Sequence, residues 1–576
     1  MRVASALSGL GALLVASLLD GVQSWTATGY TSNPTAAPLL FEEQFVEMPM
    51  CHDGICTSNK KIEVYVKRIK AKGPTGKAMW VLEGGPGYSS AGMETFMKDL
   101  YDELKEEVSI YTMDHRGVAR SSGDLLVCDN ANAVAQGSPR GLSSDFSNLP
   151  ACIENVRAKI EDKPVAFSTT SAARDLVHLI DLFNKNERVT VYGCSYGSYL
   201  AQRVIHLKPP QVFGYVVDGI VSEEKTSFAT MASDAIPTNK YFAELCESDK
   251  QCMALYDIND SKNNGGLLKA WRDLYDRLDR AHPGSNPCAD YVRGNGPLPP
   301  SEVLRMAFNL PRQYFYGVTD VEGREFVPAI MKRLHSCAQK DLDEIKRMYS
   351  APNNLEENVR GFVMNNVRNQ FDLFAGNAPI LAGLIKASEM WKTDSMTATP
   401  WLTEKQKTLE SVFSYLNREE YSWYCILNGD LKDPACDALR ELGTIENVDY
   451  SRLVLKKFTY QPDQYFRKVA NLPTYGPQDT DGVSMLYVQG KLDFQTGWNN
   501  AESVWLKRVG GVTQLWAGFD LGPHSPGIFP LGRGDTSKCG VQVIASFVRG
   551  TKAQYFNTAC MKLAPPLNFN VEPLIT

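Results

Sequence analysis

The 576-residue sequence lacks several features that would assign it to a special class of protein. It has no low-complexity tract and no repeat of about 20–50 residues, which excludes solenoids and propellers. Its 60 Lys and Arg residues against 66 Asp and Glu residues leave no basic excess, so we expect no nucleic acid as a partner. Beyond the N-terminal segment, no window of about 18 residues is apolar and uncharged, so we expect no stable membrane insertion.

The N-terminal segment has the layout of a secretory signal peptide. Arg2 precedes an apolar run from Val3 to Leu19, and small or polar residues follow up to Ser24. A membrane anchor is the alternative, but the run is short and lacks a basic flank on its C-terminal side. We therefore predict a signal peptide over residues 1–24, with cleavage near Ser24–Trp25, and a secreted, extracellular protein.

The cysteines also indicate export. Twelve of the thirteen fall into neighbouring pairs, for which we predict six short-range disulfides, and Cys194 is left over. The pairs are Cys51–Cys56, Cys128–Cys152, Cys246–Cys252, Cys288–Cys337, Cys425–Cys436 and Cys539–Cys560. No CxxC pair with matching ligands is present, so we expect no metal site. An acceptor sequon for N-glycosylation begins at Asn259.

Strand and helix patterns alternate in the first 225 residues. Residues 61–69 alternate apolar and charged side chains and predict a half-exposed strand at the edge of a sheet. Short apolar runs predict strands buried on both faces. These buried strands are expected at 78–82, 108–113, 189–192 and 215–217, and two further strands are expected at 485–488 and 513–516. Helices are expected at 93–107, 172–183, 196–206, 498–509 and 541–548. Alternation of the two predicts an α/β fold with a mostly parallel central sheet.

The alternation breaks in the middle of the chain. Residues 226–477 are mainly helical in pattern, with interruptions rich in Gly and Pro, and the strand pattern then returns. We predict a large, mainly helical cap inserted into a core that consists of residues 25–225 and 478–576. The C-terminal part of the core would carry the acid and the base.

The chemistry centres on Ser195. A β-type run ends in Gly193-Cys-Ser195-Tyr-Gly197, and an apolar periodic segment follows. A serine on a tight strand-to-helix turn needs glycine on both sides, because any side chain there would collide with the adjoining strand or helix. The amide of Tyr196 would then lie at a helix N-terminus and can donate to an oxyanion.

A glycine-rich loop supplies a second donor. The sequence Leu82-Glu-Gly-Gly-Pro-Gly87 directly follows the strand predicted at 78–82, and we choose the amide of Gly85 for the oxyanion hole. The alternative is a plain turn or a phosphate-binding loop. The loop matches neither of the glycine patterns of nucleotide-binding proteins, G-x-x-x-x-G-K-S/T and G-x-G-x-x-G, which argues against nucleotide binding.

A serine nucleophile requires a base and a carboxylate that orients it. Of the seven histidines, His524 lies in a loop between the last predicted strand and the last helix, where it can face Ser195. Asp493 closes the preceding strand, and the chain order Ser195, Asp493, His524 is that of the α/β-hydrolases. Asp520 and Asp218 are rivals for the carboxylate.

These motifs resemble secreted α/β-hydrolase peptidases of the prolyl aminopeptidase and tripeptidyl aminopeptidase family. The oxyanion loop, the elbow around Ser195 and Gly490-Lys-Leu-Asp493 are similar to that family's segments, as is Asp114-His-Arg-Gly-Val-Ala-Arg-Ser121. Similarity covers about residues 50–225 and 480–560. Glu83 stands where the family often has His or Gln, and the insertion is longer than the cap of the short prolyl enzymes.

The resemblance implies a serine exopeptidase that removes residues from the free N-terminus of a peptide substrate, without a metal or organic cofactor. Such a preference needs a carboxylate for the ammonium group, and Glu223, Glu224 and Glu83 are the candidates. A carboxylesterase or lipase on the same fold is an alternative, since the fold does not decide the acyl substrate. An inactive extracellular binding protein on a hydrolase scaffold is another. The sequence leaves the oligomeric state open.

Overall fold

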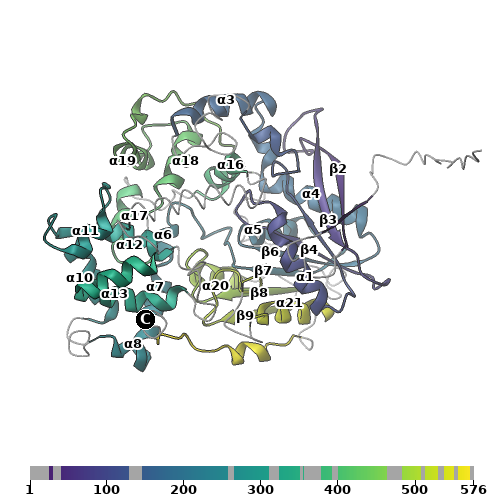
Figure 1. Ribbon diagram of the computed structural model, residues 1–576. Coiled ribbons are helices and arrows are strands. Elements are labelled where there is room, and N and C mark those ends of the chain that lie inside the picture. Colours follow the sequence, from purple (N-terminus) through teal and green to yellow (C-terminus); the bar gives the residue numbers. More distant parts are fainter. Residues whose placement is uncertain are drawn as a thin grey trace, which may run out of the picture.

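A nine-stranded sheet forms the centre of the chain in the computed structural model (Figure 1). The predicted signal peptide and the Asn259 sequon lie outside the described residues. The structure describes residues 25–29, 40–128, 146–256, 265–309, 323–349, 355, 378–391, 400–414, 416–462, 483–507, 513–529, 537–550 and 556–570.

The strands lie in the order β1-β2-β3-β5-β4-β6-β7-β8-β9. In this spatial order, each pair of neighbouring strands from β1 as far as β5 is antiparallel. Each pair from β5 through β4 to β9 is parallel. This order, with the tight turn around Ser195 directly after β6, is that of the α/β-hydrolase fold with one added edge strand. The bounds are β1 Thr26–Gly29, β2 Leu40–Pro49, β3 Lys61–Ile69, β4 Lys77–Leu82, β5 Ser109–Met113, β6 Arg188–Cys194, β7 Val212–Asp218, β8 Ser484–Gly490 and β9 Thr513–Phe519.

Strand β3 lies inside the sheet, so the prediction of an edge strand at 61–69 is wrong. It pairs with β2 on one side and with β5 on the other. Strand β2 buries Val46 and Met48 while Glu47 between them is exposed, as expected for a strand with one solvated face. The sequence of β2 contains several charged residues, so its alternation of buried and exposed side chains did not predict a strand.

Helices cover both faces of the sheet. Helices α1 and α21 pack on one face, where Tyr192 of β6 contacts Phe96 of α1 with ring centroids 4.8 Å apart. Helices α4, α5 and α20 pack on the opposite face with the neighbouring residue Val191. The two-residue period of a strand therefore divides the core into two layers. The bounds are α1 Glu94–Glu103, α3 Leu149–Lys159, α4 Thr169–Phe183, α5 Tyr196–Leu207, α20 Trp498–Lys507 and α21 Cys539–Gly550.

The described chain between β7 and β8 is helical, as the pattern predicts, and forms the teal and green part of Figure 1. Some of these helices share a second apolar cluster, which Leu567 and Phe569 of the C-terminal tail join. Others, including α16 and α18, pack with the core helices α4 and α5. The exact limits of the cap stay a prediction. Its helices are α6 Met231–Asp234, α7 Ile236–Ser248, α8 Lys250–Ala254, α10 Leu267–Arg280, α11 Pro287–Arg293, α12 Pro300–Asn309, α13 Val327–Ser336, α14 Gln339–Met348, α16 Pro379–Glu389, α17 Pro400–Thr408, α18 Arg418–Asn428 and α19 Asp437–Glu446.

All six predicted disulfides are present, with Cα–Cα distances of 5.1 to 5.9 Å. Cys194 is a buried free thiol. Among the described helices, none has the length and apolar character that crossing a membrane requires.

Candidate active site

Ser195 occupies the turn between β6 and α5 with a backbone conformation that L-residues rarely adopt, φ 51° and ψ −124°. A Cβ atom on Gly193 would lie 2.0 Å from the carbonyl oxygen of Gly197. A Cβ atom on Gly197 would lie 2.4 Å from the carbonyl oxygen of Leu82. The turn therefore closes only with glycine at both positions, which is the physical basis of the sequence motif.

Ser195 is half-buried, and hydrogen bonds fix its backbone. Its amide donates to the carbonyl oxygen of Asp218 at 2.8 Å. Its own carbonyl oxygen accepts from the amide of Ser198 at 2.9 Å and from the hydroxyl of Ser198 at 2.6 Å. A Cβ atom on Gly84 would lie 3.5 Å from the Ser195 Oγ atom. The loop after β4 thus passes directly beside Ser195.

Asp493 and His524 are hydrogen-bonded to each other. His524 Nδ1 lies 2.8 Å from Asp493 Oδ2, and because a carboxylate only accepts, Nδ1 carries the proton. Asp493 Oδ1 also accepts from the amides of Gln495 and Thr496, and its Oδ2 accepts from the Thr496 hydroxyl at 2.6 Å. Burial alone would raise the pKa of Asp493, but the adjacent imidazole and these hydrogen bonds hold that pKa below its ordinary value.

Asp218 and Gly219 connect the two halves of the site. The Asp218 main chain holds the Ser195 amide, while its Oδ2 accepts from the amide of Gly527 in the loop that carries His524, at 2.9 Å. A Cβ atom on Gly219, at φ +56°, would lie 2.9 Å from His524 Cε1. The end of β7 therefore contacts both the turn around Ser195 and the loop of His524.

The rival carboxylates point elsewhere. The side chain of Asp218 accepts from the Tyr192 hydroxyl at 2.6 Å, and burial raises its pKa to about 7. Asp520 is exposed. Of the three acids considered, the structure gives only Asp493 a hydrogen bond to His524.

Both predicted oxyanion donors lie in segments that adjoin Ser195. Tyr196 is the first residue of α5, and Gly85 is next to Gly84, whose amide already donates to Glu83 Oε1 at 2.7 Å. Within the described residues, the amides of Gly85 and Tyr196 donate to no other group. The loop is also held by the cap, because the Ala378 amide donates to the Gly87 carbonyl oxygen at 2.8 Å.

The three candidate acids have different surroundings. Glu223 is fully buried in an ion pair with Arg203, at 3.2 Å, so the expectation that it reaches the cleft mouth is wrong. Glu224 is half-buried. Glu83 is also half-buried and lies beside the nucleophile turn, with Cys194 Sγ 3.8 Å from its Oε1. Burial raises the pKa of Glu83 to about 7, with a smaller contribution from the charge of Asp114, while hydrogen bonds from Gly84 and Cys194 oppose it.

Gln489 is a site residue that sequence reasoning missed. Its Nε2 donates to Asp493 Oδ2 at 3.1 Å and to the Thr496 carbonyl oxygen at 2.8 Å, and its Oε1 accepts from the Ile220 amide at 2.8 Å. It thereby ties the acid loop to the end of β7. The available signal was a polar side chain at the end of an otherwise apolar strand.

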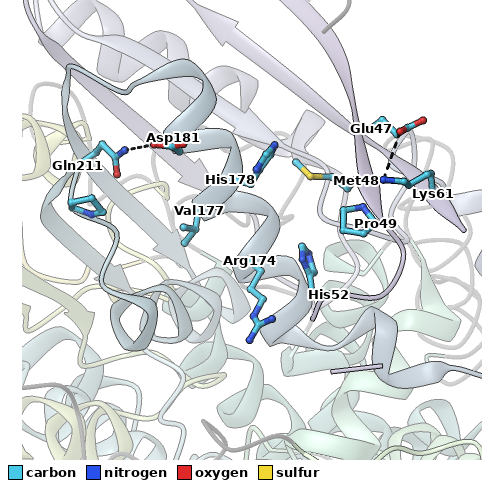
Figure 2. A pocket seen from close by; sticks show the side chains of 11 residues that line it. Glu47, Met48, Pro49, His52, Lys61, Arg174, Val177, His178, Asp181 and Gln211 are labelled. Atoms are coloured by element: carbon cyan, nitrogen blue, oxygen red, sulfur yellow. Dashed lines mark hydrogen bonds and ion pairs between the residues drawn. The ribbon is translucent and has the colours of Figure 1, made fainter. Parts of the chain in front are cut away.

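Figure 2 shows a separate hollow over α4 that includes none of the predicted site residues. Two polar contacts cross its rim, the Glu47–Lys61 ion pair and the hydrogen bond from Gln211 to Asp181. No serine, threonine or cysteine lines it, so it offers no hydroxyl or thiol nucleophile. Its lining residues are Glu47, Met48, Pro49, His52, Lys61, Arg174, Val177, His178, Asp181, Pro210 and Gln211.

No protein-family model matches the sequence, and no curated protein matches it. Solved structures similar to the chain include an esterase from Thermogutta terrifontis, at 10% identity and TM-score 0.31 over 89% of this chain and 100% of the esterase. A proline iminopeptidase from Mycobacterium smegmatis matches at 10% identity and TM-score 0.33 over 86% and 95%. A lipase matches at 11% identity and TM-score 0.30 over 88% and 98%.

Proposed function

We propose that this chain is a secreted serine hydrolase that cleaves peptide bonds near the free N-terminus of short peptides. The observation that carries the proposal is the hydrogen bond between Asp493 and His524, together with the end of β7, which binds the Ser195 amide and lies against His524. The six disulfides fit an oxidising compartment and support an extracellular location.

In this proposal His524 Nε2 takes the proton of the Ser195 hydroxyl as Oγ attacks the substrate carbonyl. Asp493 holds Nδ1 and stabilises the imidazolium, and the amides of Gly85 and Tyr196 donate to the oxyanion. Collapse of the tetrahedral intermediate transfers the proton from His524 to the leaving amine and leaves an acyl-enzyme. A water molecule, deprotonated by His524, then releases the acid product and restores Ser195.

Two features support a preference for peptide ends. The cap helix α16 contacts the oxyanion loop through Ala378 and Gly87, so the cap lies against one side of the site. Glu83, next to that loop, has a carboxyl group that pairs with no Lys or Arg side chain in the described residues. A substrate ammonium group would supply the missing charge and favour the ionised carboxylate.

The proposal is tested by comparing peptide anilides with aryl esters on the mature enzyme and on Ser195→Ala. We expect the substitution to lower turnover of peptide anilides by about four to six orders of magnitude. Labelling of the folded protein by a fluorophosphonate should disappear in the same variant. Turnover of esters alone would favour the carboxylesterase alternative, and absence of labelling would favour the inactive binding protein.

A further inference from the structure

Glu389, the last residue of the cap helix α16, is a buried carboxylate beside the nucleophile helix, and only 2% of it is exposed. Its Oε1 accepts from the Thr169 amide at 2.9 Å and from the Tyr460 hydroxyl at 2.5 Å. Its Oε2 accepts from the Tyr199 hydroxyl at 3.1 Å and lies 3.7 Å from an Arg203 guanidinium nitrogen. The acid therefore joins the cap to the start of α4 and to α5.

Two of these partners hold the ring of Tyr196. The Tyr196 hydroxyl is hydrogen-bonded to Thr169 Oγ1 at 3.0 Å. The Tyr196 ring stacks on the Tyr199 ring, with centroids 6.1 Å apart and an angle of 27° between the planes. Tyr196 directly follows the nucleophile, and its amide is one of the two proposed oxyanion donors. The side chain of that donor residue is thus fixed by groups that Glu389 binds.

The opposite end of α16 holds the other donor loop. The Ala378 amide, at the N-cap of the helix, donates to the Gly87 carbonyl oxygen at 2.8 Å. A Cβ atom on Gly87 would lie 2.7 Å from the Ala378 carbonyl oxygen, so helix and loop are in direct contact. One helix of 11 residues therefore contacts the loop of Gly85 at its start and the surroundings of Tyr196 at its end.

We propose that Glu389 is a positioning residue through which the cap fixes the geometry of the oxyanion hole. The proposal rests on the proposed function, because it assigns the Tyr196 amide to the oxyanion. Removing one oxyanion donor costs about a hundredfold to a thousandfold in turnover, and a small displacement costs a part of that. Four donors converge on the two oxygens of Glu389, and a glutamine offers them one oxygen and a competing NH2 group.

The test uses Glu389→Gln, with Glu420→Gln as the matched control. Glu420 pairs with Lys386 between α18 and α16, at 2.5 Å, and within the described residues it has no hydrogen bond with Tyr196, Thr169 or Tyr199. The readouts are kcat and KM with a peptide anilide, the rate of fluorophosphonate labelling, and the affinity for an arylboronic acid, whose tetrahedral adduct occupies the oxyanion hole. Unfolding followed by circular dichroism checks that each variant is folded.

For Glu389→Gln we expect kcat to fall about tenfold to a hundredfold, with KM changed less than about threefold. Boronate affinity should fall by the same factor as kcat/KM, since only the tetrahedral state uses the donors. Glu420→Gln should stay within about threefold of the wild type in both quantities. Thr169→Val, which keeps the amide bonded to Glu389, should reproduce the loss, and the double variant should lose no more than either single variant.

Equal effects of the two glutamine variants, a loss confined to KM, or unchanged boronate affinity would overturn the proposal. If Glu389→Gln does not fold, kcat, KM, labelling rate and boronate affinity of Thr169→Val test the proposal instead. Labelling and boronate binding do not depend on peptide recognition, so a failure of the peptidase assignment alone would leave these readouts in place. A wild-type protein that neither reagent modifies would overturn both proposals together.

Discussion

Two fully buried arginines illustrate different uses of a buried charge in this molecule. Arg116 forms two hydrogen bonds with Asp175, at 2.6 and 2.7 Å, and donates to the carbonyl oxygens of Met50 and Ala166. All these groups belong to the core, and they tie the end of β2 to α4. Burial alone would raise the pKa of Asp175, but Arg116 and His52 hold it below its ordinary value.

Arg203 is bound less tightly and by two acids. It lies 3.2 Å from Glu223 in the core and 3.7 Å from Glu389 in the cap, and a further bond goes to the Thr170 hydroxyl at 2.6 Å. The first arginine therefore serves the stability of one unit. The second, Arg203, links α5 to α16 near Ser195, the proposed nucleophile, so we expect a change of geometry there to lower activity more than stability.

Asp175→Asn should have the largest effect on stability. It leaves Arg116 without its carboxylate partner, and removing one member of a buried pair costs about 3–5 kcal/mol. Glu389→Gln should cost only about 1–2 kcal/mol, because Arg203 keeps Glu223. Denaturant unfolding measures both, with kcat per folded molecule expected to be unchanged in the first variant and lowered in the second. If the two variants lose stability and activity in the same proportion, the distinction between the roles of Arg116 and Arg203 is wrong.

Glu83 differs from the acids that pair with Arg116 and Arg203, because its carboxyl group pairs with no arginine in the described residues. With a pKa of about 7, it is ionised above that pH and protonated below it. The kcat/KM ratio of free-amine to N-acetylated substrate should therefore drop about tenfold as the pH falls below 7, and drop again above about 8, where the substrate amine loses its proton. Taking the ratio removes every effect of pH that the two substrates share.

In Glu83→Gln the drop below pH 7 should disappear, while the drop above about pH 8 remains. Asp520→Asn, at an exposed position, is the control and should retain both limbs. A lower limb that persists in Glu83→Gln would assign the ammonium group to a different acid.

Tyr460→Phe should have the smallest effect. It removes one of the hydrogen bonds to Glu389 Oε1 but leaves the Thr169 amide in place, so kcat should change by less than about threefold. The expected loss of stability is about 1 kcal/mol, measured by thermal unfolding. A fall in kcat as large as that of Glu389→Gln would mean that the whole buried network, and not the link through Thr169, controls the site.

The sequence predicts the elements whose causes are local. Gly193 and Gly197 are required by backbone atoms within the turn and in the neighbouring strand, so the motif around Ser195 predicts the geometry. Asp493 and His524 follow from chain order, since the C-terminal ends of parallel strands meet at one edge of the sheet. The parallel sheet follows from strands that are apolar on both faces.

Features that depend on distant partners could not be predicted in this way. Glu389 is separated from Thr169 by 220 positions, and nothing in its own segment indicates a buried acid. Glu223 has the appearance of a surface acid until Arg203 on α5 is brought against it. The position of β3 inside the sheet also depends on a partner, because its outer neighbour β2 carries several charged residues and was not predicted as a strand.

The most direct test of the central claim is the hydrolysis rate of a tripeptide anilide with a free amine against that of its N-acetylated counterpart. The mature enzyme and Ser195→Ala are assayed side by side. The account predicts that the wild-type enzyme cleaves only the free-amine substrate at a substantial rate and that the variant cleaves neither. Equal cleavage of both substrates by the wild-type enzyme would contradict the assignment as an exopeptidase.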